Sequence, residues 1–145
     1  MIETIQESEL FKDVTPRVLT EIANGSEEVT FRQGETVFRK GENSQDVYEL
    51  IEGSIDLVAF DREIVHLTAS RGGQIFGWSA LVEPYRRTAT AKCATDSRVI
   101  RIPRGSIEST IERHPHEGTV ILKNLMRIIA DRLRVAYSYI YSSGE

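Results

Sequence analysis

The most informative segment of this chain is IFGWSALVEPYRRTATAKC, residues 75–93. Gly77 permits a tight backbone bend, and the small residues after it suit one helical turn whose free N–H groups point toward an anion. Arg87 then stands at the entrance to a strand-like run in which polar and small residues alternate. A helical turn, an arginine and a hydroxyl at a strand edge together make a phosphate pocket. On these residues alone, an ordinary surface loop with an Arg pair is an equally good interpretation.

Short strands are predicted around this segment, over residues 27–103 as a whole. Apolar and polar residues alternate in short runs, and turn residues separate the runs at intervals of about 8–12 residues. The expected strands are at Val29 to Phe31, 36–38, 47–51, 55–59, 64–67, 88–95 and 98–102, with turns at Asp61-Arg62 and Asp96-Ser97 and a break at Arg71-Gly72-Gly73. This spacing favours an antiparallel sandwich or barrel.

Helices are predicted before and after the strands. In residues 1–26, a helix is expected to start at Thr15-Pro16, with a side-chain cap from the threonine, and to end at Asn24-Gly25. The C-terminal zone, residues 104–141, begins with a short helix that ends near His114-Pro115. A much longer helix then follows.

This long helix, expected from Glu117 to Tyr141, carries two apolar stripes. The first has heptad spacing and consists of Leu122, Met126, Ile129, Leu133, Ala136 and Ile140. The second lies beside it and consists of Ile121, Leu125, Ile128, Val135 and Tyr139. Either one stripe packs on the domain and the other on a partner helix, or both pack on the same domain. A helix of ~25 residues is about 37 Å long, more than a small barrel covers, so we expect a homodimer through this helix.

The composition fits one small soluble domain and excludes several classes of protein. The chain has 145 residues, 40% of them hydrophobic, with 18 Lys plus Arg, 22 Asp plus Glu and a formal charge of -4. This balance argues against a surface that binds nucleic acid throughout, and the single cysteine excludes a disulfide framework and a thiolate-rich zinc site. No apolar run approaches the ~20 residues of a membrane span, and Met1-Ile2-Glu3 does not start a signal peptide. We therefore expect a cytoplasmic protein without membrane contact.

Two motifs together give the chain a resemblance to a known family. One consists of Phe76-Gly77, Ala80-Leu81, five loop residues and Arg87-Thr88-Ala89, and the other of Gly41-Glu42, the strand from Val47 to Leu50, and Gly53. In this order and separation they resemble the cyclic nucleotide-binding domain of catabolite activator proteins, cyclic-nucleotide-regulated kinases and gated channels. The resemblance covers nearly the whole chain. Glu49 departs from it, because the family usually has an apolar residue there, and Phe38 and Ser44 are milder departures.

The resemblance implies a fold and a function. The fold is mainly β, a double-stranded β-helix or jelly-roll-like barrel with short N-terminal helices and a long C-terminal helix, in one domain over residues 1–145. The function is that of a non-enzymatic sensor in signal transduction and transcription regulation. Its small anionic ligand, such as cyclic AMP or cyclic GMP, binds at the phosphate-cassette-like loop 76–88. A ligand that binds more tightly when the long helix is in one position shifts the dimer toward the geometry that goes with that position.

The resemblance also assigns roles to individual residues. Arg87 pairs with the cyclic phosphate, and Thr88 donates a hydroxyl hydrogen bond to it. Backbone N–H groups around Ala80 complete the anion site, while Gly77 keeps the loop close to the ligand. On the long helix, Met126, Ile129 and their neighbours are expected near the base. The full expected ligand set is Phe76, Gly77, Trp78, Ser79, Ala80, Leu81, Arg87, Thr88 and Ala89.

Trp78, the only tryptophan, stands where the family has a glutamate that accepts a hydrogen bond from the ribose 2′-hydroxyl. Loss of a hydrogen bond to a charged group costs ~1.5–3 kcal/mol, which is roughly ten- to a hundredfold in affinity. Three interpretations stay open. The indole fills the pocket and leaves a ligand-independent domain, it stacks on a flat ligand that is not a ribose cyclic phosphate, or it swings outward and leaves weak cyclic nucleotide binding. Glu83 offers a substitute carboxylate, but its variable loop favours a solvated side chain.

No catalytic residue and no metal site are expected. A metal-dependent cupin on a similar barrel needs His-x-His on a strand with a further histidine and a carboxylate. Here His66 stands alone on a predicted strand, and His114-Pro115-His116 falls at a helix junction. Cys93 has the strand phase of a small core residue rather than the setting of a nucleophile.

Two alternatives to a ligand sensor stay open. One is a degenerate, ligand-independent domain that serves in dimerisation or docking. The other is the effector half of a DNA-binding transcription regulator without its helix-turn-helix, the module that follows the long helix in catabolite-activator-type proteins. The sequence ends at Ser142-Ser143-Gly144-Glu145, and Lys123, Arg127, Arg132 and Arg134 have the pattern of a solvated helix face. We expect no nucleic-acid binding by these residues alone.

Overall fold

The computed structural model of the chain describes residues 1–59, 62–68 and 73–143, and for residues 2, 62–68 and 139–143 it describes the backbone only. In chain order the elements are α1 (Ile2–Gln6), α2 (Pro16–Asn24), β1 (Glu27–Phe31), β2 (Thr36–Phe38), β3 (Asp46–Glu52), β4 (Ser54–Ala59), β5 (Arg62–Thr68), β6 (Ile75–Phe76), a 3₁₀ turn (Trp78–Leu81), β7 (Thr90–Cys93), β8 (Ser97–Pro103), α3 (Arg104–Arg113) and α4 (Pro115–Ser143). The predicted turn at Asp61-Arg62 and the break at Arg71-Gly72-Gly73 fall partly outside the described residues.

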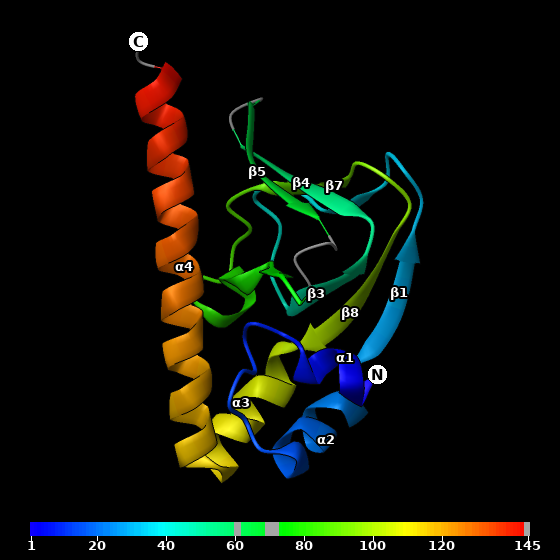
Figure 1. The fold of residues 1–145 in the computed structure, drawn as a ribbon, viewed down its shortest axis with the longest axis vertical. Coiled ribbons are helices and arrows are strands. Elements are labelled where there is room, and N and C mark those ends of the chain that lie inside the picture. Colours follow the sequence, from blue (N-terminus) through cyan, green and yellow to red (C-terminus); the bar gives the residue numbers. More distant parts are fainter. Residues whose placement is uncertain (60–61, 69–72, 144–145) are drawn as a thin grey trace.

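Two four-stranded antiparallel sheets form the β part of the fold (Figure 1). The strand order is β1-β8-β3-β6 in one sheet and β2-β7-β4-β5 in the other. A core between the sheets contains Phe38, Tyr48, Leu50, Ile55, Leu57, Phe76, Ala91, Cys93 and Val99. The predicted fold class, mainly β with antiparallel strands between helical ends, is therefore confirmed. The described strands form two facing sheets rather than one closed barrel.

Alternation along β3 divides its side chains between two cores. Tyr48 and Leu50 belong to the core between the sheets, whereas Val47 belongs to a second core on the outer face of the sheet. Glu49 has the same phase as Val47 and points to that outer face. There α1, α2, α3 and the first half of α4 form a helical layer, which lies below the sheets in Figure 1.

The α2 helix begins and ends where the sequence predicts, but the expected side-chain cap is wrong. Thr15 is the N-cap residue, and its hydroxyl makes no capping hydrogen bond. Its backbone N–H instead donates to Oε2 of Glu117 in α4 at 3.1 Å. The local start signal is therefore the proline at the first helical position, and a tertiary contact with α4 fixes the residue before it.

The α4 helix is the longest element and stands along one side of the domain (Figure 1). Its buried residues are Ile121, Leu125 and Ile128, and its exposed large apolar residues are Leu122, Met126, Leu133, Val135 and Tyr137. The two stripes do not separate as predicted. In the second stripe Ile121, Leu125 and Ile128 pack on the domain, but Val135 is exposed. In the first stripe Ile129 packs against the same core, whereas Leu122, Met126 and Leu133 are exposed. The packed residues belong to the helical-layer core rather than to a barrel surface. The side chains of Tyr139 and Ile140, which end the two predicted stripes, lie outside the described part.

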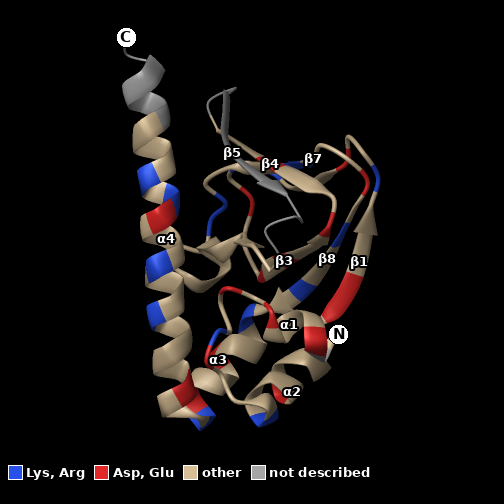
Figure 2. Ribbon diagram, viewed as in Figure 1, with Lys and Arg blue, Asp and Glu red and all other residues tan. Residues whose placement is uncertain are grey.

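Lys and Arg residues and Asp and Glu residues are distributed over both the strands and the helices (Figure 2). Glu27 and Glu28 of β1 form ion pairs with Arg101 and Arg98 of the neighbouring β8. Basic residues recur along α4. No helix in the described part of the chain combines the length and the apolar character that a membrane crossing requires.

Candidate functional site

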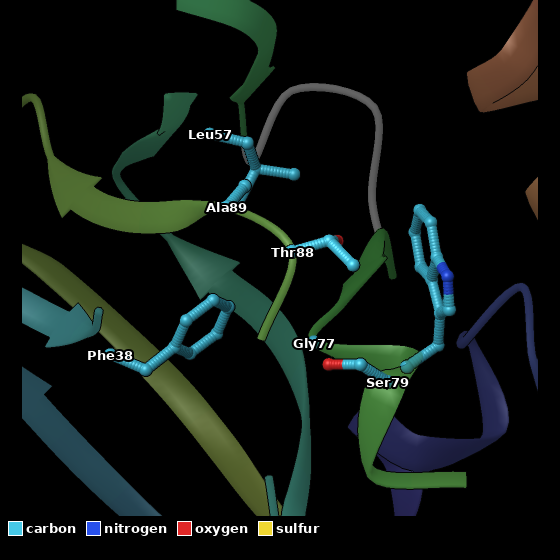
Figure 3. A pocket seen from close by; sticks show the side chains of 7 residues that line it. Phe38, Leu57, Gly77, Ser79, Thr88 and Ala89 are labelled. Atoms are coloured by element: carbon cyan, nitrogen blue, oxygen red, sulfur yellow. The ribbon is translucent and has the colours of Figure 1, made fainter. Parts of the chain in front are cut away.

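A pocket lies where the 3₁₀ turn meets the segment that leads into β7 (Figure 3). Its volume is about 290 Å³ with the open mouth included. The lining consists of Phe38, Leu57, Gly77, Trp78, Ser79, Thr88 and Ala89. The fold therefore brings the two ends of the predicted motif around one cavity. Thr88 and Ala89, which the alternating pattern predicts as strand, precede β7 and line this cavity instead.

Gly77 sets the backbone path at the pocket. Its φ of 79° is in the left-handed region, which residues with a Cβ occupy only at a cost. A Cβ at this position would also lie 2.7 Å from Nη1 of Arg87 and 3.2 Å from the ring of Phe38. Both the conformation and the space at this turn therefore require glycine.

The guanidinium of Arg87 lies directly behind this turn. Its Nη1 donates to the carbonyl oxygen of Gly77 and its Nη2 to that of Asp46, both at 2.7 Å. Its Cζ is 4.0 Å from the centre of the Phe38 ring. Arg87 is only 5% exposed, and this burial lowers the pKa of its guanidinium. The side chain is thus held by two carbonyl dipoles and an aromatic face.

Arg87 is a buried cation without a carboxylate partner among the described residues. Its polar partners are the two backbone carbonyls, and its Nε is buried with no hydrogen-bond partner. Carbonyl oxygens and a ring face stabilise a buried positive charge less than a full negative charge does. An anion beside Gly77 would supply the missing counter-charge.

Two hydroxyl groups reach the pocket from two of its sides, one on Ser79 and one on Thr88 (Figure 3). Oγ of Ser79 lies 3.1 Å from Oγ of Ser44, so either hydroxyl can donate to the other. Thr88 is exposed. They are the hydroxyl groups of the described pocket lining.

The other predicted ligand residues lie behind the lining. Phe76 and Ala80 are fully buried, and Leu81 packs against the helical-layer core. The N–H of Ala80 donates to the carbonyl oxygen of Gly77 at 3.3 Å, within the 3₁₀ turn. The sequence missed Phe38 and Leu57, which come from β2 and β4.

Phe38 could have been singled out from the sequence, because it departs from the family's pattern. Leu57 could not, because its inward-facing position in the strand is the same as that of any core residue.

Trp78 forms one wall of the pocket. It is partly buried, packs against the helical-layer core, and its ring centre lies 5.3 Å from Cζ of Arg132 in α4. Glu83, the suggested substitute carboxylate, is exposed. Met126, expected near the base, is 63% exposed on the outer face of α4. No described residue of α4 lines the pocket.

Glu49 is a second unusual group, and it lies outside the pocket. Its side chain is fully buried under the helical layer, and neither carboxyl oxygen has a hydrogen-bond partner. Burial raises its pKa from 4.5 to about 8, and the charges of Glu7 and Glu9 add to the effect. The position that departs from the family's pattern is therefore a carboxyl kept neutral in an apolar setting.

The remaining predicted polar candidates have structural surroundings. Nε2 of His114 lies 2.9 Å from Oε2 of Glu21, where the α3–α4 junction meets α2. His116 is exposed, and the side chain of His66 lies outside the described part. Cys93 is buried in the core between the sheets. In the part of the chain that the structure describes, no three His, Cys, Asp or Glu residues form a metal-binding group.

Comparison with known proteins agrees with this geometry. A sequence profile described as "Cyclic nucleotide-binding domain" matches residues 28–114, more than half of the chain. The chain therefore belongs to the cyclic nucleotide-binding domain family, as its two motifs predict. A similar curated protein is the CRP-like cAMP-activated global transcriptional regulator of Mycobacterium tuberculosis, which is 29% identical over 136 residues. The match covers 92% of this chain and 59% of that regulator, so the chain spans little more than half the regulator's length.

Solved structures share the fold. A cyclic nucleotide-binding protein from Geobacter metallireducens has a TM-score of 0.76 and 27% identity, and the match covers 86% of this chain and 91% of that one. The catabolite activator protein of Thermus thermophilus has a TM-score of 0.73 and 23% identity, covering 94% of this chain and 63% of that one. At that identity the second likeness concerns the fold alone.

Proposed function

We propose that this chain is a regulatory sensor domain without enzymatic activity, which binds a small anionic ligand, a cyclic nucleotide or a relative of one. The observation that carries the proposal is Arg87, a buried cation beside the pocket that has no carboxylate partner among the described residues. The family is described by this ligand class, and the Mycobacterium tuberculosis relative is described as activated by cAMP.

The chemistry of the pocket suits a phosphate diester. A phosphate beside Gly77 would accept charge-assisted hydrogen bonds from Arg87 in place of the two carbonyls that now accept them. The hydroxyls of Thr88 and Ser79 add neutral donors to the same oxygens. Leu57 and the other apolar lining residues would face the sugar and the base.

Trp78 changes which part of the ligand the pocket recognises. The described lining contains no acidic residue, so no carboxylate there accepts a hydrogen bond from a ribose 2′-hydroxyl. The partly buried position of Trp78 in the pocket wall supports a ligand that lies against the indole. We therefore favour a ligand that contacts the indole, with an affinity for cyclic AMP roughly ten- to a hundredfold below that of a pocket with the carboxylate.

A second copy of this chain is the proposed partner of α4. Leu122, Met126 and Leu133 of the heptad stripe are 44%, 63% and 46% exposed. A row of exposed apolar residues marks an interaction surface, and heptad spacing matches a partner helix. In such a homodimer, a ligand that prefers one position of α4 changes the arrangement of the two copies.

Calorimetric titration with cyclic AMP and with cyclic GMP tests the sensor function. We expect the wild-type protein to bind at least one nucleotide and Arg87→Ala to lose at least tenfold in affinity, because it loses hydrogen bonds to a charge. Arg86→Ala is the matched control, since Arg86 is exposed and donates to the carbonyl oxygen of Gly41. Equal affinities of the two variants would contradict the proposed site.

A ligand-independent docking or dimerisation domain is the second candidate function. One observation favours it: both Nη atoms of Arg87 already donate to backbone carbonyls, so the turn is complete without a ligand. A wild-type protein that forms dimers and gives no heat with either nucleotide would support this candidate over the sensor.

The place of the domain in a longer transcription regulator is also a proposal. The Mycobacterium tuberculosis regulator is longer than the region that this chain matches. We propose that the chain corresponds to the effector half of such a DNA-binding regulator. A gel-shift experiment with the 145 residues alone is expected to show no complex with DNA.

A further inference from the structure

A single guanidinium in α4 connects the pocket with two other segments. Nη1 of Arg132 donates to the carbonyl oxygen of Ile75 in β6 at 2.9 Å, and Nη2 donates to Oε1 of Glu9 at 3.1 Å. The ring centre of Trp78 lies 5.3 Å from Cζ of the same residue. The side chain of Arg132 is 11% exposed. Three parts of the chain that are far apart in sequence, Glu9, residues 75–78 and α4, therefore meet at one charge.

Glu9 is fixed before it meets Arg132. Its Oε1 also accepts a hydrogen bond from the N–H of Ile75 at 2.9 Å, and its own N–H donates to the carbonyl oxygen of Gly73 at 3.0 Å. Its carbonyl oxygen accepts from Nη2 of Arg127 in α4 at 3.4 Å. Because the carboxylate is already oriented, less side-chain entropy is lost when the ion pair forms than in an ordinary surface pair.

Arg132 lies about one turn beyond the part of α4 that packs on the helical layer. The face of α4 that packs on the domain consists of Ile121, Leu125, Ile128 and Arg132, which have helical spacing. The next residue of that spacing, Val135, is 45% exposed. Arg132 therefore holds α4 to β6 and to Glu9 beyond the helical layer, and α4 also lies beside β5.

The pocket is small while the indole stands in its wall. The enclosed space of the pocket, without the open mouth, is about 40 Å³, far below the ~300–1,000 Å³ of small-molecule sites. A nucleotide would therefore need part of the wall to move, and Trp78 is the wall residue beside Arg132. We propose that Arg132 is a positioning residue that holds Trp78 in the path of the ligand, so that ligand binding and the packed state of α4 compete.

This inference rests on the proposed function for the identity of the ligand. It adds the direction in which ligand binding changes the packing of α4. Ligand binding separates Trp78 from Arg132 and loosens α4 beyond position 132. By thermodynamic reciprocity, a change that loosens this contact raises the affinity for the ligand. A cation–π contact of ordinary strength corresponds to about two- to thirtyfold in affinity.

Fluorescence tests whether Arg132 holds the indole. Arg132→Met removes the charge and keeps the length of the side chain. Arg134→Met is the matched control, because Arg134 lies on the exposed side of the same helix and pairs with Asp131. Trp78 is the only tryptophan, so the tryptophan emission reports on the surroundings of this one indole. We expect stronger acrylamide quenching and faster hydrogen exchange beyond residue 132 in Arg132→Met, and wild-type values in Arg134→Met; equal quenching in all three proteins would overturn the inference.

Titration with cyclic AMP tests the competition. We expect Arg132→Met to bind about two- to thirtyfold more tightly than wild type, Arg134→Met to bind like wild type, and Arg132→Lys, which keeps the cation, to lie between. Unchanged or weaker binding by Arg132→Met would overturn the competition. If no protein binds cyclic AMP, the proposed function fails for that nucleotide, and the quenching and exchange measurements still decide the role of Arg132.

Glu9→Gln provides a second variant at the other end of the contact. The amide oxygen keeps an acceptor for the N–H of Ile75, while the charge that faces Arg132 is lost. We expect its quenching and affinity to change in the same direction as in Arg132→Met. The double variant should change little beyond Arg132→Met, because both act through one contact. Fully additive effects would show that Glu9 does not act through Arg132.

Discussion

Replacement of Glu49 by glutamine removes a buried titratable carboxyl group whose effect on stability depends on pH. The folded protein keeps the proton of Glu49 up to about pH 8, because burial and the charges of Glu7 and Glu9 raise its pKa, whereas the unfolded chain releases it above pH 4.5. Between these values the folded state binds the extra proton. The free energy of unfolding therefore falls as the pH rises, by about 1.4 kcal/mol per pH unit.

The size of the effect follows from this window. Below pH 4.5 both states hold the proton and above pH 8 neither does, so Glu49 adds no pH dependence at either end. Between pH 5 and pH 7.5 the stability lost amounts to about 3 kcal/mol, a large share of the ~5–15 kcal/mol of an ordinary domain. Glutamine does not titrate, and its extra buried N–H costs about 1–3 kcal/mol at every pH.

Urea unfolding at a series of pH values between 5 and 7.5, followed by circular dichroism, measures this difference. We expect the stability of Glu49→Gln relative to wild type to rise by about 3 kcal/mol across the series. Glu112→Gln is the control, because Glu112 is exposed on α3 and should leave the pH dependence unchanged. Parallel curves for wild type and Glu49→Gln would refute the reasoning, since they would mean that Glu49 titrates alike in the folded and unfolded states.

Three further changes test the pocket and the dimer. Trp78→Glu places a carboxylate at the expected ribose position, and calorimetry should show a roughly ten- to hundredfold higher affinity for cyclic AMP. The variant should also bind cyclic AMP more tightly than its 2′-deoxy analogue, a preference that we expect wild type to lack. Equal affinities of the variant for the two nucleotides would contradict the role assigned to position 78. Gly77→Ala should lower the free energy of unfolding by about 1–2 kcal/mol because of its left-handed backbone, relative to Gly105→Ala, where a Cβ meets no neighbour within 4 Å; equal thermal midpoints would count against it. Leu133→Glu should sediment as a monomer, whereas Val82→Glu should stay a dimer, although Val82 and Leu133 are both 46% exposed. An unchanged mass for Leu133→Glu would show that the heptad stripe of α4 is not part of the dimer interface.

The strands and helices were predictable where local patterns are strong. The strand-forming residues of β3 and the proline at the start of α2 mark both elements in the sequence. β6 was not predictable, because two residues carry no period. The expected side-chain cap of α2 by Thr15 was wrong, and the hydrogen bond from the Thr15 N–H to Glu117 of α4 joins positions too far apart in sequence for a local pattern to predict.

The candidate site was predictable only in the part that is continuous in sequence. Gly77, Ser79 and Thr88 belong to one motif and line one pocket. Phe38 and Leu57 complete the lining from other strands, where inward phase looks the same for a pocket residue and a core residue. Whether a predicted ligand residue faces the cavity, as Ser79 does, or lies behind it, as Ala80 does, depends on how the turn packs.

By itself, the order of residues determined the antiparallel sheets between helical ends, the family, and the arginine that follows a glycine-containing turn, because hydrophobic period and motif spacing are local properties. Only the tertiary structure decided that the Nη donors of Arg87 are bound to two backbone carbonyls, and that Glu49 is buried without a partner. It alone also decided that Arg132 meets Trp78 and Glu9, the last of these 123 positions away in the chain. Contacts over such separations form when whole layers pack, and no local pattern encodes which side chains then meet.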